Sequence, residues 1–340
     1  MEKTRISLIL IILFYSGIII SISTAHVPVN PDQSEGLATA TRIDDPTKSW
    51  VIYGESTLDQ LTQYFYFDIL AFDTLFLSFT KAIRDENMNY NPKLILFGVE
   101  FNSSEVLDSH IEIPEGYGWI IISDEVQEKI YEPFGPSYYD PLGLYNYTTP
   151  SDARYYLAIT AESEGFYSIA IGLNERYSLI EWITVPLSMV NVYLWEGQSI
   201  LFLLLPWVIT IGIGYFLIKK YQLTDANTDY KEKLFILIIA LSNFCSSLNF
   251  FSQILISMYK SGQNEGLIIS IVIGILPALT GLMMVRSLVL SNNSMTRLNQ
   301  KLTIYSIINL LIWAGFVIFP LISLMYVVWR VIFYPSVARL

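Results

Sequence analysis

The two histidines of this 340-residue chain are its sharpest candidates for metal chemistry. His26 follows the small-residue triplet Ser23-Thr24-Ala25, so cleavage of a signal segment after Ala25 would give His26 a free α-amino group. That amino group, the His26 imidazole and the His110 imidazole would offer three nitrogen ligands of the kind that suit Cu(II). The alternative is a flexible arm at His26 and a solvated His110. The copper hypothesis requires the two rings to come within a few ångströms of each other.

Clustered oxygen atoms make calcium the second candidate metal. Asp44 and Asp45 precede a predicted strand, and Asp85, Asn87 and Asn89 share a predicted loop. Asp and Asn also favour loops because they bond their own backbone, so turn formation is the alternative. No other cofactor is expected.

The motifs of the common enzyme classes are missing from the sequence. It has no Walker loop, no G-x-S-x-G nucleophile elbow and no H-E-x-x-H pair. The single cysteine, Cys245, excludes a disulfide within the N-terminal half and any cysteine-rich zinc or iron–sulfur site. Pairs of carboxylates are abundant, but abundance carries no specificity. We therefore expect a non-catalytic protein.

The N-terminus has the features of an export signal. Lys3 and Arg5 precede an apolar run over residues 6–22, which predicts a signal peptide over residues 1–25. An uncleaved signal anchor is the alternative. Both place the next segment, 26–178, outside the cytoplasm. That segment carries 24 acidic and 8 basic residues, a balance of −16 that would repel nucleic acid.

Four later apolar runs are each long enough to cross a hydrocarbon core of ~30 Å as a helix: 198–218, 234–258, 267–285 and 302–328. Seven basic residues lie in the loops after the first and third runs, so the positive-inside rule places these loops in the cytoplasm. The sequence thus predicts a multi-pass protein of the cell membrane with a four-helix domain over 198–330 and a tail over 331–340 on the outside.

A shorter apolar segment, 179–197, precedes the first run. Its Trp182, Tyr193 and Trp195 suit a membrane–water interface, which predicts an interfacial elbow helix. A long helix continuous with the first run is the alternative.

The second run carries a polar stripe with the spacing i, i+4, i+7, i+11. Its members are Ser242, Ser246, Asn249 and Gln253. Such a stripe is typical of helix packing, within the domain or against a partner subunit, and a polar conduit is the alternative. The runs contain no Asp or Glu, which argues against coupled active transport.

Residues 26–178 have the alternation of an all-β domain. Strand-length runs rich in β-branched and aromatic residues occupy 49–53, 63–68, 74–79, 93–97, 119–122, 155–159 and 166–171. Seven or eight short strands in this length predict a two-sheet sandwich. Residues 161–165 are expected to close a hairpin between the last two strands.

Several of these segments resemble a known family in their order and residue types. They are ATATRI at 38–43, QYFYFDI at 63–69, NPKLILF at 91–97, ARYYL at 153–157 and GFYSIAI at 165–171. Residues 38–173 resemble the bacterial pre-peptidase C-terminal domain. That resemblance implies a jelly-roll-like β-sandwich that is non-catalytic and sometimes binds calcium or an extracellular polymer. Two departures are the lack of an attached enzyme and the long insert 101–147.

Two further features concern the surface of this domain. Rigid aromatic residues at Tyr131, Phe134, Tyr138 and Tyr139 could form a recognition surface, or else cover one end of the core. The sequons at Asn102 and Asn146 lie in the exported domain and that at Asn292 in a cytoplasmic loop, so we expect glycan only on the first two.

The sequence therefore predicts an all-β ectodomain, a two-sheet jelly-roll-like sandwich, followed by an all-α membrane domain of four transmembrane helices. The function expected is that of an envelope protein whose ectodomain binds a ligand or partner and whose helices assemble with a membrane complex. Its partners would be membrane lipid and another membrane or envelope protein. A copper-binding redox accessory protein and an ectodomain sensor are the alternatives.

Overall fold

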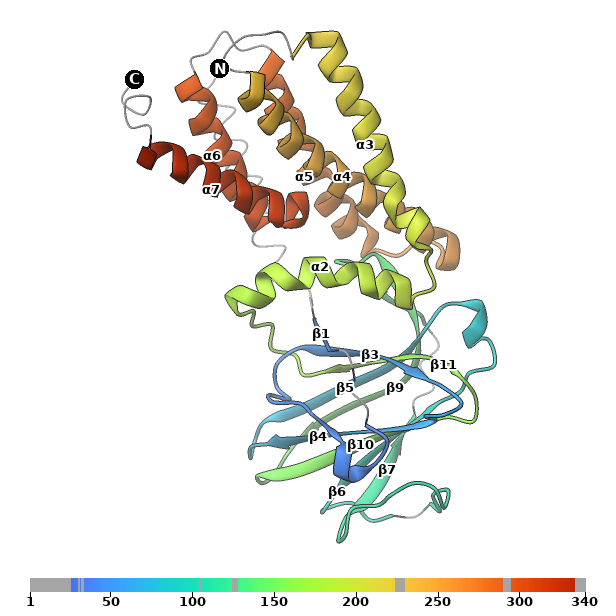
Figure 1. Ribbon diagram of the computed structural model, residues 1–340. Coiled ribbons are helices and arrows are strands. Elements are labelled where there is room, and N and C mark those ends of the chain that lie inside the picture. The colour runs from blue at the N-terminus through green and yellow to red at the C-terminus, as the bar shows by residue number, and fades with distance from the viewer. Residues whose placement is uncertain are drawn as a thin grey trace. The chain divides into compact units, whose positions relative to one another are not determined.

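The computed structural model describes residues 26–29, 31, 34–103, 105–123, 128–223, 230–289 and 295–333 (Figure 1). The chain divides into two compact units. The sandwich unit comprises the chain up to Phe134 together with Tyr138–Glu181 and Asn191–Gly197. The helical unit comprises Gly135–Ser137, Trp182–Val190 and the chain from Gln198 onward. The predicted signal segment, Asn292 and most of the predicted tail lie outside the described residues.

The sandwich unit contains two β-sheets within the described residues. The six-stranded sheet has the order β1 (Val27–Val29), β3 (Trp50–Ser56), β11 (Gly165–Ile171), β5 (Thr74–Ala82), β9 (Ser137–Thr148), β8 (Ile130–Glu132). The five-stranded sheet has the order β2 (Thr41–Arg42), β4 (Thr62–Ile69), β10 (Ala153–Thr160), β6 (Lys93–Gly98), β7 (Gly118–Ile122). Two short 3-10 turns, η1 (Leu37–Thr39) and η2 (Asp85–Asn87), lie in the connections. A β-rich N-terminal half with two sheets is thereby confirmed.

The seven predicted strands correspond to β3, β4, β5, β6, β7, β10 and β11. The long strand β9 was not predicted, because Pro141 and Gly143 interrupt its alternation. Its pairing with β5 shifts register between Phe79 and Thr80, and Leu142 falls in this irregularity. A bulge of this kind lets a strand accommodate proline.

The predicted hairpin at residues 161–165 is wrong. Strand β10 pairs with β4 and β6 in one sheet, whereas β11 pairs with β3 and β5 in the other. The turn residues Glu164 and Gly165 reverse the chain, but they carry it from one sheet to the other. Local turn chemistry does not specify which sheet the next strand joins.

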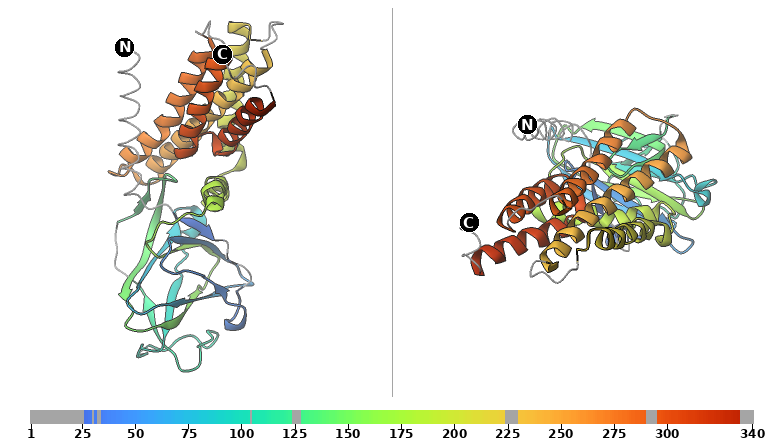
Figure 2. Two further views of the ribbon diagram at one scale, coloured as in Figure 1. Left: turned by 90° about the vertical axis from the view of Figure 1, so that its left-hand side faces the viewer. Right: turned by 90° about the horizontal axis from the view of Figure 1, so that it is seen from above.

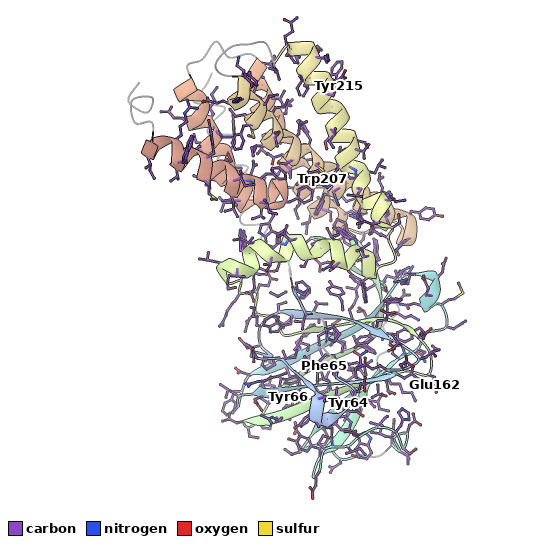
Figure 3. The ribbon with its side chains drawn as sticks, viewed as in Figure 1. Tyr64, Phe65, Tyr66, Glu162, Trp207 and Tyr215 are labelled. Atoms are coloured by element: carbon purple, nitrogen blue, oxygen red, sulfur yellow. The ribbon has the colours of Figure 1, made fainter. Side chains whose placement is uncertain are left out.

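The core lies between the sheets and consists of alternate side chains of the strands. Phe65, Phe67, Leu75, Leu77 and Leu157 are all fully buried there (Figure 3 labels Phe65). Gly54 has a packing role, because a Cβ at this position would lie 2.2 Å from the Tyr167 ring. Burial of this set is the main stabilising contribution to the unit.

Helix α2 (Leu179–Trp195) confirms the helix predicted at 179–197. It begins with a capping box in which the Ser178 hydroxyl accepts from the Glu181 amide and the Glu181 carboxylate accepts from the Ser178 amide. Lys48 forms an ion pair with Glu181 within the sandwich unit. Tyr193 is buried, and Trp195 donates its indole N–H to the Gly54 carbonyl at 2.8 Å. These two aromatics therefore contact protein, in contrast to the predicted interfacial role.

The helical unit has three helices that are long and apolar enough to cross a membrane among the described residues. They are α3 (Ile200–Tyr221), α4 (Tyr230–Ser261) and α5 (Leu267–Val289). The views in Figure 2 show α4 and α5 packed along each other. Ser247 bonds the Gly274 carbonyl at 2.7 Å across this pair, and Gly281 approaches the Ala240 carbonyl closely. Small and hydroxyl-bearing residues are typical of such membrane helix contacts.

The fourth predicted span is not confirmed. Its residues form α6 (Met295–Leu311), a 3-10 turn η3 (Ala314–Phe316) and α7 (Ile318–Phe333). Helices of 17 and 16 residues are about 26 and 24 Å long, which is short of a ~30 Å core. Between them the backbone has positive φ at Trp313, Gly315, Phe316 and Val317. Hydropathy alone does not detect such a break.

Helices α6 and α7 fold back on each other as an antiparallel hairpin. Ser306 of α6 donates to Ser323 of α7 at 2.6 Å. Near the end of α7, Arg330 forms an ion pair with Glu232 in the first turn of α4. The end of α7 therefore lies beside the start of α4.

Candidate functional site

A polar cavity of about 130 Å³ opens at one end of the sandwich unit. It is lined by residues of three separate segments: Asn89, Asn91, Lys93, Asp108, His110, Thr160, Ala161, Glu162 and Ser163. Glu162 is the second residue after β10, and Figure 3 shows it at the edge of the sandwich. The volume equals that of about four water molecules. The cavity therefore fits a small polar group and is well below the size of a drug-like ligand site.

The strand ends and one anchored loop fix the geometry of this cavity. Thr160, the last residue of β10, is the Cα partner of Lys93, the first residue of β6. Its hydroxyl lies 3.3 Å from His110 Nε2 and 3.1 Å from the Thr62 hydroxyl. Two residues after His110, the Glu112 amide donates to the Tyr64 hydroxyl at 2.8 Å. The loop that carries His110 is thus held against the five-stranded sheet.

The lining has groups of both charge signs. Lys93 contributes one positive charge and Asp108 and Glu162 contribute two negative charges, so these three residues sum to +1 − 2 = −1. Asparagine, serine and threonine side chains supply both donors and acceptors. The cavity can bind a ligand that forms hydrogen bonds and carries a cationic amino group. No phenylalanine, tyrosine or tryptophan is among the described residues that line it.

The structure does not bring the two histidines together. His26 Nδ1 contacts the Ser49 hydroxyl beside Trp50, and Trp50 pairs with Ile171 at the end of β11. His110 lies by Thr160, the last residue of β10, which ends five residues before β11 begins, and the seven residues of β11 span roughly 20 Å. Burial lowers the pKa of His26 to about 4, so its ring is neutral. Among the described residues, no group of three His, Cys, Asp or Glu side chains is placed to hold a metal ion.

Several of the candidate calcium ligands already make contacts within the protein. Asp45 accepts from both the amide and the hydroxyl of Thr47, as in a turn, and Asp44 pairs with Arg42 at the surface. Buried Asn87 donates to the carbonyls of Ala82 and Phe166 and accepts from the Phe166 amide.

In the second of these clusters Asp85 begins η2, and Asn89 lines the polar cavity. The Asn87 side-chain oxygen already accepts a hydrogen bond from the Phe166 amide. The loop therefore lacks a free oxygen at the middle one of its three candidate calcium ligands.

The predicted recognition aromatics are not an exposed surface. Tyr138 and Tyr139 are buried, Tyr131 packs on Tyr138 with ring centroids 4.8 Å apart, and Phe134 is half-buried. The structure thus follows the alternative in which the rings cover protein. The sequon residues Asn102 and Asn146 are exposed, as glycosylation would require.

A second group of titratable residues lies in the interior of the sandwich unit. The Tyr139 hydroxyl donates to buried Glu196 at 2.8 Å, and Tyr53 stacks edge-on against Trp195 at 4.9 Å. Burial raises the pKa of nearby Glu132 to about 8. These contacts join β3, β8 and β9 to the end of α2, so we assign the group to stability rather than to ligand binding.

The polar stripe of α4 is used in part for packing. Gln253 exchanges two hydrogen bonds with Gln198, and Ser242 donates to the Ile239 carbonyl of its own helix. Ser246 Oγ is buried without a hydrogen-bond partner among the described residues, and Asn249 is half-buried.

The chain matches no protein-family model and no curated protein. Its site must therefore be assigned from geometry. The sequence predicted His110 and Asn89 as candidate metal ligands. It did not predict the cavity that they share, because the lining residues are far apart in the chain. The one available signal was that two of the three segments, 89–93 and 160–163, adjoin predicted strands.

Proposed function

We propose that the protein is a non-catalytic, membrane-anchored envelope protein whose sandwich unit binds a small polar ligand that carries an amino group. The polar cavity beside His110 and Thr160 carries this proposal. Two carboxylates, one lysine and several neutral donors and acceptors favour an amino-bearing ligand over an anion. The resemblance to the pre-peptidase C-terminal domain supports a binding role, because that domain is non-catalytic.

Direct titration of the full chain in detergent tests the ligand class. Ethanolamine and ethylene glycol each have about four non-hydrogen atoms, which matches the cavity volume, and they differ by the amino group, so we expect saturable calorimetric binding of ethanolamine and little heat from ethylene glycol. Replacing both Asp108→Asn and Glu162→Gln should weaken ethanolamine binding about tenfold or more, because both countercharges are lost. Asp59→Asn removes an exposed acid outside the cavity and should change nothing. Equal binding of both compounds, or none, would contradict the proposal.

We further propose an orientation for the helices. Lys219 and Lys220 end α3, and Lys231 and Lys233 lie at the start of α4, which favours a cytoplasmic position for these ends. The Arg330–Glu232 ion pair attaches the end of α7 to the same side. Three spans and one hairpin then give a cytoplasmic C-terminus. This revises the outward tail expected from four spans.

Cysteine labelling distinguishes the two orientations. In a Cys245→Ser background, we expect a membrane-impermeant maleimide to label Glu265→Cys in intact cells. Asn292→Cys and Leu340→Cys should react only after permeabilisation. In a host that glycosylates exported proteins, glycan should occur on Asn102 and Asn146 alone. Labelling of Leu340→Cys in intact cells would restore the four-span topology.

A further inference from the structure

The break between α6 and α7 is an unusual stretch of backbone for a helical unit. Three residues other than glycine have positive φ within five positions: Trp313 at 52°, Phe316 at 55° and Val317 at 61°. Each such conformation costs of order 1–3 kcal/mol and persists where the surroundings hold it, often at a functional site. Non-helical backbone at membrane depth occurs where it is buried in protein or lines a polar space.

Asn243 of α4 directs an acceptor toward this break, and the neighbouring hydrogen bonds fix its orientation. Thr280 uses its hydroxyl proton on the Pro277 carbonyl at 2.9 Å, so its oxygen can only accept from Asn243. The Asn243 amide nitrogen donates to it at 3.2 Å and to Met284 Sδ at 3.7 Å. The Asn243 side-chain oxygen, fully buried, is left without a hydrogen-bond partner among the described residues.

Ser242 adds a second acceptor at the same point. Its hydroxyl proton is used on the Ile239 carbonyl at 2.7 Å, so only lone pairs remain for other contacts. The Asn243 Oδ1 and Ser242 Oγ atoms lie 2.9 and 3.0 Å from where a Cβ on Gly315 would be. Two buried oxygen atoms that have no proton available to donate therefore lie against the unwound turn.

Ala314, Gly315 and Val317 of the break are buried, and Trp313 and Phe316 are half-buried. Trp207 of α3, labelled in Figure 3, stacks on Phe316 with ring centroids 5.0 Å apart. In the last turn of α6, Asn309 is fully buried, and neither of its amide atoms has a hydrogen-bond partner among the described residues. Unpaired polar atoms in a low-dielectric interior cost free energy unless a ligand satisfies them.

The chemistry of these groups selects the ligand. Lone pairs attract a cation and repel an anion, and a divalent ion would require carboxylates. In the described parts of α3 to α7 the one acidic residue is Glu232, which is paired with Arg330. Neutral amide, hydroxyl and backbone oxygens are the ligands that bind alkali-metal ions in membrane proteins.

We propose that the break between α6 and α7 binds a partly dehydrated monovalent cation through Asn243, Ser242 and the unwound backbone. Cation binding at this break does not depend on the ligand of the sandwich unit, and it does not require the carboxylates of coupled active transport.

Thermal unfolding of the full chain in detergent, followed with a thiol-reactive coumarin maleimide, tests this site. Cys245 is the single cysteine, fully buried in α4, so its reaction reports on the helical unit and not on the sandwich unit. At equal ionic strength, we expect Na⁺, K⁺ or Li⁺ to raise the unfolding temperature by roughly 2–4 °C over N-methylglucamine. Equal unfolding temperatures in all four salts would overturn the proposal.

Three variants separate cation binding from packing. Asn243→Ala should abolish the cation-dependent rise. Asn243→Asp, nearly isosteric, should lower the cation concentration at half-effect by about tenfold, because a carboxylate attracts the ion. Ser247→Ala removes a hydrogen bond of the same helix to Gly274 and should lower the unfolding temperature equally in every salt. If Asn243→Ala does not fold, the unfolding temperatures of Asn243→Asp in the four salts test the proposal. Equal values in all four salts would show that Asn243 is a packing residue only.

Discussion

Replacing Trp195 with alanine should lower the free energy of unfolding of the sandwich unit by about 2–4 kcal/mol. The indole ring lies 4.9 Å from Tyr53 and 6.4 Å from Phe166, both in edge-to-face contact. Its N–H donates to the Gly54 carbonyl, and its own backbone carbonyl accepts from Arg84 at 2.7 Å. The substitution leaves a cavity and removes the partner of a carbonyl in the middle of β3. Urea titration of the full chain, read by proteolysis of the sandwich unit, measures the loss.

The conservative change separates the hydrogen bond from the ring. Trp195→Phe keeps an aromatic side chain but loses the N–H and part of the ring system, so it should cost about 1 kcal/mol more than the same change at a tryptophan whose N–H makes no hydrogen bond. Trp119→Phe is the matched control, because the Trp119 indole N–H has no hydrogen-bond partner among the described residues. A Trp195→Ala protein as stable as wild type would show that the end of α2 does not hold the sandwich.

Much of the sandwich could be predicted because its strands alternate strongly. Runs such as Gln63–Asp68 place every second side chain in the core, and this periodicity survives in a single sequence. Strand β9 was not predicted because Pro141 and Gly143 are residue types that favour turns. The strand accommodates them only through the bulge in its pairing with β5. The pairing of β10 and β11 with different sheets is likewise a tertiary property.

Hydropathy predicted three of the apolar helices correctly, but it did not predict the break in the fourth apolar run. The run at 302–328 is continuous in composition, and Gly315 is the sole residue in the turn that adopts positive φ without strain. The break is held by partners from other helices, such as Trp207 against Phe316. The polar cavity was missed for a related reason, since Asn91, His110 and Glu162 meet only after the sheets have formed.

Raising the pH from about 4.5 to 8 should progressively destabilise the sandwich unit through Glu132. Burial raises the pKa of this carboxyl to about 8, and the negative charge of Glu175 adds to the effect, while the Phe134 amide partly opposes it. Over this window the unfolded chain has lost the proton and the folded chain still holds it, so the free energy of unfolding falls as pH rises. Above pH 8 both states are ionised and the loss is complete.

Glu181 should act in the opposite direction and at lower pH. Burial alone would raise the pKa of this carboxyl, but the Lys48 ammonium and the Ser178 hydrogen bonds hold it below its usual value. Its contribution is present above pH 4.5 and is lost as the pH falls through the lowered pKa. The two groups therefore produce separate limbs of one stability profile, an acid limb from Glu181 and a neutral-to-alkaline limb from Glu132.

Two neutral variants assign the limbs. Glu132→Gln keeps the shape of the side chain without its titration, so the fall between pH 4.5 and 8, about 5 kcal/mol in wild type for a pKa raised from 4.5 to about 8, should disappear. Glu181→Gln should leave that fall intact and reduce the acid limb instead. The measurement is urea denaturation of the full chain in detergent at pH 4, 5, 6, 7, 8 and 9. A Glu132→Gln protein with the same decline as wild type would show that Glu132 titrates normally, and the alkaline limb would then belong to another group of the buried cluster.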